Sequence, residues 1–151
     1  MKKKLTTLFA LAFIAISSFA QQSPVKWTSK AVKENANTYK VIITATVPAP
    51  WHIYSQYMKD GGPVPTTFDF TKNPLMTLQG KTAEKGDLKT VRDKNFDNME
   101  VKYYSGKVDF IQVVKVKGNI KTNVSGKINF MVCNDHECLP PSDQSFSVKL
   151  Q

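Results

Sequence analysis

The chain has 151 residues, a formal net charge of +9 and only two cysteines. This length suits one domain with its own apolar core. The lysines are scattered singly, and no basic cluster with interleaved aromatic residues appears, so we expect no nucleic-acid partner.

The first twenty residues have the pattern of a secretion signal. Three lysines at positions 2–4 precede an apolar run over residues 5–16, and small residues ending at Ala20 supply a cleavage site. The apolar run is shorter than the roughly 20 residues that span a bilayer, so we expect cleavage and no membrane span afterwards. Residues 1–20 are therefore predicted to be a signal peptide, and residues 21–151 a single exported domain. Export brings the cysteines into an oxidising compartment, where two nearby thiols tend to form a disulfide.

The first strong strand signal covers residues 39–47, which are rich in β-branched side chains. Its odd-numbered residues fall on one face at period two, which predicts a core face. Pro48 and Pro50 end this strand, and a short aromatic segment, Trp51-His52-Ile53-Tyr54, follows.

Two further short strands are expected at residues 66–70 and 75–78. Residues 80–98 are polar and weakly patterned, so they are predicted to form a long loop with one short strand near residues 88–91. Phe96 stands alone within this segment, an aromatic residue between polar neighbours.

Regular alternation resumes near residue 100. Strands are expected at residues 100–104, 108–116, 120–124, 127–132 and 145–150, with a turn at Ser105-Gly106. In residues 127–132 the alternation directs Val132 toward the core and places Met131 and Cys133 on the opposite face. No segment has a helical period with caps, so eight or nine short strands predict an all-β sandwich.

The two cysteines stand together in Cys133-Asn134-Asp135-His136-Glu137-Cys138, at the tip of a predicted hairpin. A structural disulfide is one interpretation, and closing so short a loop stabilises a domain by about 2 kcal/mol. A metal site is another, although structural zinc sites usually combine two such motifs. A redox pair is the third, since one thiolate can attack and the other can resolve a mixed disulfide. Protonated His136 would favour a thiolate, but an ordinary surface histidine fits equally well.

The cysteine hairpin is followed by Leu139-Pro140-Pro141 and one last strand. With Trp51-His52-Ile53-Tyr54 upstream and an aromatic residue in the segment between, it resembles the N-terminal periplasmic domain of the thiol:disulfide interchange protein DsbD. The resemblance spans most of the chain after the signal peptide. It implies an immunoglobulin-like β-sandwich in the periplasm, whose Cys133–Cys138 pair carries electrons by thiol–disulfide exchange without a cofactor or a metal.

The resemblance also implies roles for individual residues. In the family a loop phenylalanine covers the disulfide between partners, and its position matches Phe96. An aromatic-x-tyrosine motif beside the active site corresponds to His52 and Tyr54. The family suggests that Cys138 forms the mixed disulfide and Cys133 resolves it.

Three departures from the family pattern concern the site. Four residues separate the cysteines here rather than five, His52 replaces a tyrosine, and Lys94 and Asn95 stand where acidic residues would precede Phe96.

The implied electron donors are thioredoxin-like proteins and a membrane thiol reductant, and the implied acceptors are periplasmic thiol-disulfide proteins. We expect donor and acceptor to be separate proteins. The alternative is a non-catalytic, secreted β-sandwich that binds a partner and carries a structural disulfide.

Overall fold

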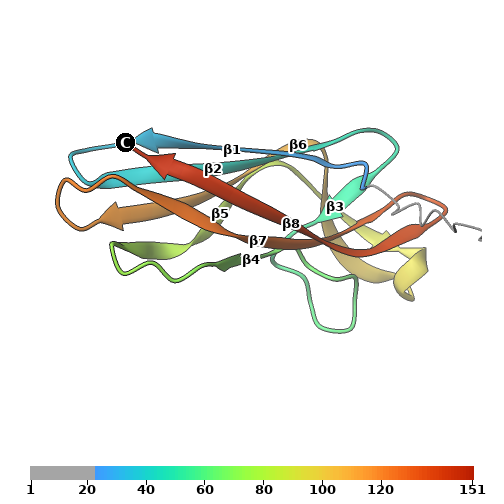
Figure 1. Ribbon diagram of the computed structural model, residues 1–151. Coiled ribbons are helices and arrows are strands. Elements are labelled where there is room, and N and C mark those ends of the chain that lie inside the picture. Colours follow the sequence, from blue (N-terminus) through green and yellow to red (C-terminus); the bar gives the residue numbers. More distant parts are fainter. Residues whose placement is uncertain (1–22) are drawn as a thin grey trace, which may run out of the picture.

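The computed structural model describes residues 23–151, and the signal peptide predicted at residues 1–20 lies outside them. The described chain is all-β, as predicted, with one short 3-10 helix, η1 (Figure 1). In chain order the elements are β1 (Lys26–Lys33), β2 (Thr38–Val47), β3 (His52–Tyr54), β4 (Thr67–Phe70), β5 (Met76–Asp93), η1 (Lys94–Phe96), β6 (Met99–Val116), β7 (Thr122–Cys133) and β8 (Cys138–Leu150).

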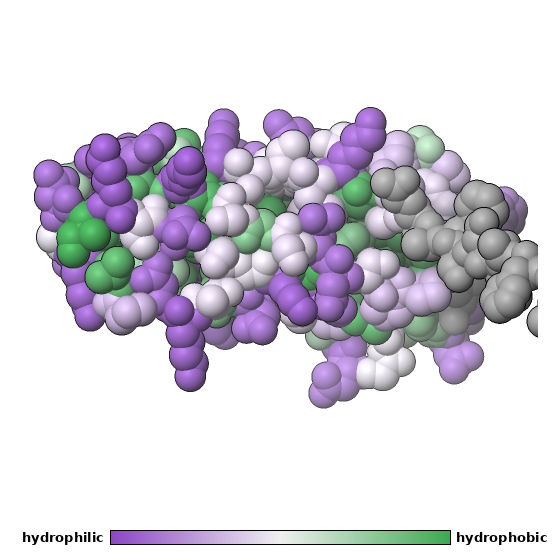
Figure 2. All heavy atoms as spheres, in the orientation of Figure 1, coloured by the Kyte–Doolittle hydropathy of each residue, from purple (hydrophilic) through white to green (hydrophobic). Residues whose placement is uncertain are grey.

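These eight strands form one continuous antiparallel sheet that curls around a main core. Along the principal path the strand order is β1-β2-β6-β3-β7-β4, while β5 also pairs with β6 and β8 also pairs with β7. The curl brings the first and last strands, β1 and β8, against each other. The sheet thereby encloses its apolar side chains, and the face drawn in Figure 2 is mostly hydrophilic.

The alternation predicted for residues 39–47 is confirmed by β2, whose odd-numbered side chains are buried in the main core. Strand β7 follows the same rule, because Val132 faces this core while Met131 and Cys133 belong to a separate cluster. Full burial of an aliphatic or aromatic side chain contributes roughly 1.5–3 kcal/mol, so these alternating faces dominate the stability.

The prediction of a long loop at residues 80–98 is wrong, because most of this segment is part of strand β5. β5 continues to Asp93 and pairs with β6 along most of its length. In the described sheet it is an edge strand, and most of its side chains are exposed. Because it has little buried face, it lacks the apolar alternation by which strands are recognised. Strand β1, also an exposed edge strand, was not predicted for the same reason.

The prediction of a turn at Ser105-Gly106 is also wrong, because strand β6 continues through these two residues without a break. Gly106 has a φ of 76°, which a glycine adopts at little cost. The register of β6 against β5 shifts beside it, which marks a β-bulge that bends the strand. On one side of the bend β6 pairs with β2, and on the other side it pairs with β3. The bend thus brings β6 to the end of the sheet that holds the cysteines.

Candidate redox site

A disulfide joins the end of β7 to the start of β8. Cys133 and Cys138 are register partners, with their Cα atoms 4.0 Å apart. Between them, the Asn134 side-chain oxygen accepts hydrogen bonds from the backbone N–H groups of His136 at 2.8 Å and Glu137 at 2.9 Å, which closes the turn. Cys133 is fully buried, whereas Cys138 is partly exposed. The two cysteines therefore differ in their access to solvent.

Strand β3 places two of the predicted site residues on the face that carries the disulfide. His52 is the register partner of Cys133, and Tyr54 lies two residues further along β3. Side chains two residues apart in a strand point to the same face, so His52, Tyr54 and Cys133 share one face of the sheet. Ile53, between the first two, points into the main core.

A small cluster of side chains, which we call the site cluster, surrounds the disulfide. Its buried members are Tyr54, Val101 and Cys133, and its partly buried members are Met58, Phe96, Tyr103, Met131 and Cys138. Phe96 comes from the end of η1 and lies edge-on to Tyr54, with 6.1 Å between the ring centres. The structure thus brings Phe96, Tyr54 and both cysteines together.

Polar contacts connect His52 to Asp93 through Tyr54. The Nε2 atom of His52 lies 3.2 Å from the Tyr54 hydroxyl, and this hydroxyl donates a hydrogen bond of 3.4 Å to Asp93 Oδ2. The donor and acceptor in the contact between His52 and Tyr54 depend on the histidine tautomer, and when the hydroxyl donates to Asp93 the imidazole proton has to be on Nε2. Neutral His52 then has Nδ1 as its acceptor atom.

The charges of the site follow from burial. Burial lowers the pKa of His52, an effect that the carboxylates of Asp93 and Asp135 oppose. Burial also raises the pKa of Tyr54, and the charge of Asp93 and the hydrogen bond to it raise this pKa further. Both shifts favour the neutral side chains near pH 7. The interior of the site is therefore uncharged, and the carboxylates lie around it.

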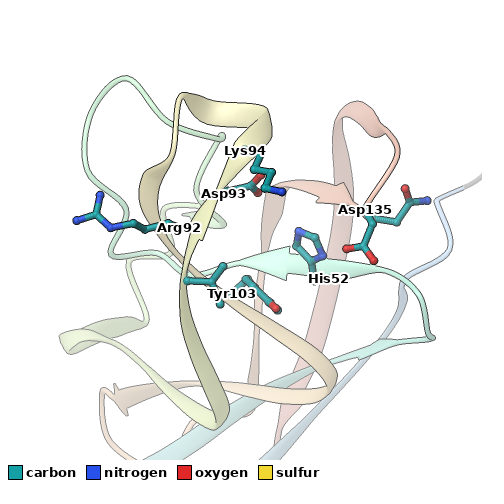
Figure 3. Close-up of a pocket in the computed structure, with 8 residues that line it drawn as sticks. His52, Arg92, Asp93, Lys94, Tyr103 and Asp135 are labelled. Atoms are coloured by element: carbon teal, nitrogen blue, oxygen red, sulfur yellow. The ribbon is translucent and has the colours of Figure 1, made fainter.

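An open pocket of about 380 Å³ lies beside the disulfide turn (Figure 3). It is lined by His52, Val91, Arg92, Asp93, Lys94, Tyr103, Asn134 and Asp135. The His52 ring packs on Tyr103 with 4.4 Å between the ring centres. In Figure 3 one ring nitrogen of His52 is on the side of Asp93 and Lys94, and the other is on the side of Asp135. The lining of the pocket thus includes two cationic and two anionic residues next to the packed rings of His52 and Tyr103, although the Arg92 guanidinium points away from His52.

The structure does not bring the His136 side chain into the site. It is exposed on the turn and belongs neither to the site cluster nor to the lining of the pocket. Sequence reasoning in turn missed Met58, Val101 and Tyr103 as neighbours of the disulfide. The alternation in residues 100–104 predicts that Val101 and Tyr103 share a face, but only the pairing of β6 with β3 shows which face it is.

A second polar network fastens the chain where it leaves β3. The Glu84 carboxylate accepts hydrogen bonds from the Ser55 hydroxyl at 2.8 Å, the Gln56 backbone N–H at 2.7 Å and the Tyr104 hydroxyl at 2.8 Å. Burial and this carboxylate raise the pKa of Tyr104, so its hydroxyl keeps its proton and remains a donor. Edge strand β5 therefore holds the end of β3 in place.

Both cysteines are engaged in the disulfide. Among residues 23–151, no group of three or more histidine, cysteine, aspartate and glutamate side chains is arranged to hold a metal ion. Within the same residues, no helix is long and apolar enough to cross a membrane.

Comparison with protein families decides the identity of the domain. Residues 20–150 match the family described as "Thiol:disulfide interchange protein DsbD, N-terminal". The chain belongs to this family. The resemblance inferred from the cysteine hairpin is thus confirmed. A comparison with curated protein sequences gave no significant match.

Two solved structures are similar to this DsbD N-terminal family member. The N-terminal periplasmic domain of ScsB from Proteus mirabilis has a TM-score of 0.55 at 16% identity, covering 82% of this chain and 44% of that one. The DsbD N-terminal domain of Neisseria meningitidis, in its reduced form, has a TM-score of 0.51 at 11% identity, covering 80% of this chain and 82% of that one. At these identities the likeness shows the fold alone, and it confirms the predicted immunoglobulin-like sandwich. The chain spans less than half the length of the ScsB structure.

Proposed function

We propose that this domain relays electrons in the periplasm by thiol–disulfide exchange through Cys133 and Cys138. Membership of the family supports thiol–disulfide interchange in general. The observation that carries the relay is the asymmetry of the pair, in which Cys138 is partly exposed at the end of a hairpin and Cys133 is buried beneath aromatic side chains. Cys138 is thus the more accessible residue of the pair, and Cys133 lies next to it beneath the aromatic side chains.

The exchange has two halves. In the first, a donor thiolate attacks Cys138, the Cys133–Cys138 bond breaks, and the second thiol of the donor releases the domain as a dithiol. In the second, the Cys138 thiolate attacks an acceptor disulfide, and the Cys133 thiolate then attacks Cys138. This last step restores the Cys133–Cys138 bond and frees the acceptor as a dithiol. Each cycle moves two electrons and needs no cofactor.

Phe96 is proposed to cover the pair between partners. Its ring packs on the site cluster, and the chain that carries it reverses through Asp97 and Asn98, whose φ values are 49° and 55°. Aspartate and asparagine tolerate this left-handed conformation better than most residues. A compact turn of this kind can move as a unit when a partner docks and uncover Cys138. Until then, the ring keeps small oxidants from the dithiol.

The proposed partners follow from this chemistry. Thioredoxin-like proteins and a membrane thiol reductant would supply electrons, and periplasmic thiol-disulfide proteins would accept them. The predicted signal peptide supports the periplasmic location. The charged side chains around the pocket, Arg92, Asp93, Lys94 and Asp135, provide contacts for a partner surface next to Cys138.

The other candidate, a binding module with an inert disulfide, differs in its reduction potential. We expect the Cys133–Cys138 pair, equilibrated with glutathione, to have a potential of about −180 to −270 mV, the range of exchange proteins. Thioredoxin should then reduce it rapidly. A potential below about −300 mV would identify a structural bridge and contradict the relay.

A further inference from the structure

The resolving step poses a chemical problem for Cys133. The nucleophile in thiol–disulfide exchange is the thiolate, so the reduced Cys133 thiol must lose its proton before it can attack Cys138. Cys133 is fully buried among the apolar and aromatic side chains of the site cluster. Such surroundings disfavour a charged thiolate and restrict the access of water that could take the proton. A base within the site would remove this barrier.

His52 occupies the position from which a base can act. It is the register partner of Cys133 across β3 and β7, and both side chains project from the same face. The Cβ atoms of directly opposed residues lie roughly 4.5–5.5 Å apart, so an imidazole can reach the opposing sulfur without a movement of the backbone. The other histidine, His136, has an exposed side chain outside the site cluster.

The orientation of the ring suits this role. Nε2 is engaged with the Tyr54 hydroxyl, which in turn is bonded to Asp93, so these groups hold the ring and its tautomer. Among the residues that the structure describes, His52 makes no other side-chain hydrogen bond, so the acceptor atom Nδ1 is available. Figure 3 shows the second ring nitrogen turned toward Asp135, which lies in the turn between the two cysteines. A base oriented by a third group is the arrangement that activates nucleophiles in many enzymes.

Charged and titratable groups face His52 from each element around it. They are Tyr54 on β3, Tyr103 on β6, Asp93 on β5, Lys94 on η1, and Cys133 and Asp135 on β7 and the following turn. Arg92 on β5 also lines the pocket, but its guanidinium points away from His52 and bonds to the Asn98 carbonyl. Burial lowers the pKa of the imidazole and keeps it neutral, so that it can accept a proton near pH 7. Asp93 and Asp135 act in the opposite direction and stabilise the imidazolium once it has formed.

We propose that His52 accepts the thiol proton of Cys133 during resolution of the mixed disulfide, an inference that rests on the proposed relay. The proton moves from Cys133 Sγ to His52 Nδ1, and the thiolate attacks Cys138 Sγ. The Cys133–Cys138 bond forms, and the bond between Cys138 and the acceptor sulfur breaks. The pair is oxidised, the acceptor is reduced, and the imidazolium returns its proton to the leaving thiolate.

The test uses the reduced protein with excess glutathione disulfide, quenched with acid and analysed by mass spectrometry. His52→Gln keeps a donor for the Tyr54 hydroxyl but cannot act as a base. We expect it to form the glutathione adduct within about twofold of the wild-type rate, whereas the adduct should disappear at least tenfold more slowly at pH 7. The difference should shrink as the pH rises, because hydroxide can then take the thiol proton without help from His52. His136→Gln, the matched control, should behave like the wild type.

An adduct that disappears equally fast in His52→Gln overturns the inference, and so does a slowing that is the same at every pH, because altered packing alone would cause it. If His52→Gln does not fold, the His52 ring can be titrated by NMR in the reduced protein and in reduced Cys133→Ala. A titration unchanged by the loss of Cys133 overturns the inference as well. Failure of the relay has a different signature, since the wild type itself would then resist reduction by thioredoxin.

Discussion

The two faces of the sheet near the disulfide are built from the same three strands but have different compositions. On the core face, Ile53 from β3, Tyr104 from β6 and Val132 from β7 pack into the main core. On the site face, Tyr54 and Cys133 are buried in the site cluster, where a disulfide, aromatic rings and a hydrogen-bonded hydroxyl replace aliphatic packing. Because strand side chains alternate, one residue of a short segment packs into the main core and the next packs beside the disulfide.

Because the two faces carry different side chains, mutations should affect stability and redox behaviour separately. Changes on the core face should lower the free energy of unfolding and leave the exchange chemistry of the folded protein intact. Changes on the site face should alter the exchange chemistry and have little effect on the free energy of unfolding.

The two cysteines should behave differently when each is replaced. Cys133→Ser leaves the exposed Cys138 free to attack, so a stable mixed disulfide with thioredoxin-like partners should accumulate. Cys138→Ser leaves only the buried thiol and should form almost none. Both variants should lose about 2 kcal/mol of stability with the short disulfide loop. Non-reducing gels and chemical denaturation measure the two effects, and equal trapping by both variants would show that the order of attack is wrong.

Phe110→Ala tests the core face. The Phe110 ring is fully buried and contacts Trp27 and Phe68, with ring centres 6.0 Å and 4.9 Å away. Removing it should lower the free energy of unfolding by about 3–5 kcal/mol. Below the unfolding transition, the rate of reduction by thioredoxin should stay at the wild-type value. A large change in that rate would mean that the two faces are coupled.

Phe96→Ala tests the site face. The ring is only partly buried, so the free energy of unfolding should change by less than about 1 kcal/mol. Oxidation of the reduced pair by a small disulfide should accelerate by about tenfold, equivalent to about 1.4 kcal/mol of barrier. The control is Phe146→Ala, a partly buried ring packed on the main core, which should leave this rate unchanged. An unaltered rate in Phe96→Ala would show that the ring does not cover the pair.

The smallest effect concerns stability at acid pH. Burial holds the pKa of folded His52 below its ordinary value of 6.5, so below that pH the unfolded chain binds more protons than the folded one. The stability should therefore be complete above pH 6.5 and decline as the pH falls from there through the lower folded-state pKa. Denaturation midpoints across this range should show the decline in the wild type and in His136→Gln. In His52→Gln the decline should be weaker, and an identical pH dependence would contradict the assignment to His52.

Much of the fold was predictable because it depends on neighbours in the sequence. The alternation in β2 and in the second half of β7 identified their core faces, since period two appears wherever one face of a strand is buried. Strands β5 and β1 were not predicted, because both faces of an exposed edge strand carry mostly polar side chains and no apolar alternation results. The bend of β6 at Gly106 was mistaken for a turn, because a glycine in a bulge and a glycine in a turn look the same in a sequence.

The cysteine hairpin and the class of fold could be predicted from the order of residues alone, and the resemblance to the family added candidate roles for His52, Tyr54 and Phe96. The folded chain was needed to show that His52 lies opposite Cys133, that Tyr54 connects His52 to Asp93, and that the His136 side chain lies outside the site cluster. The physical reason is the distance along the chain over which each kind of interaction acts. Alternation and turn chemistry are properties of adjacent residues, whereas the register between strands far apart in the chain exists only once the sheet has closed around its core.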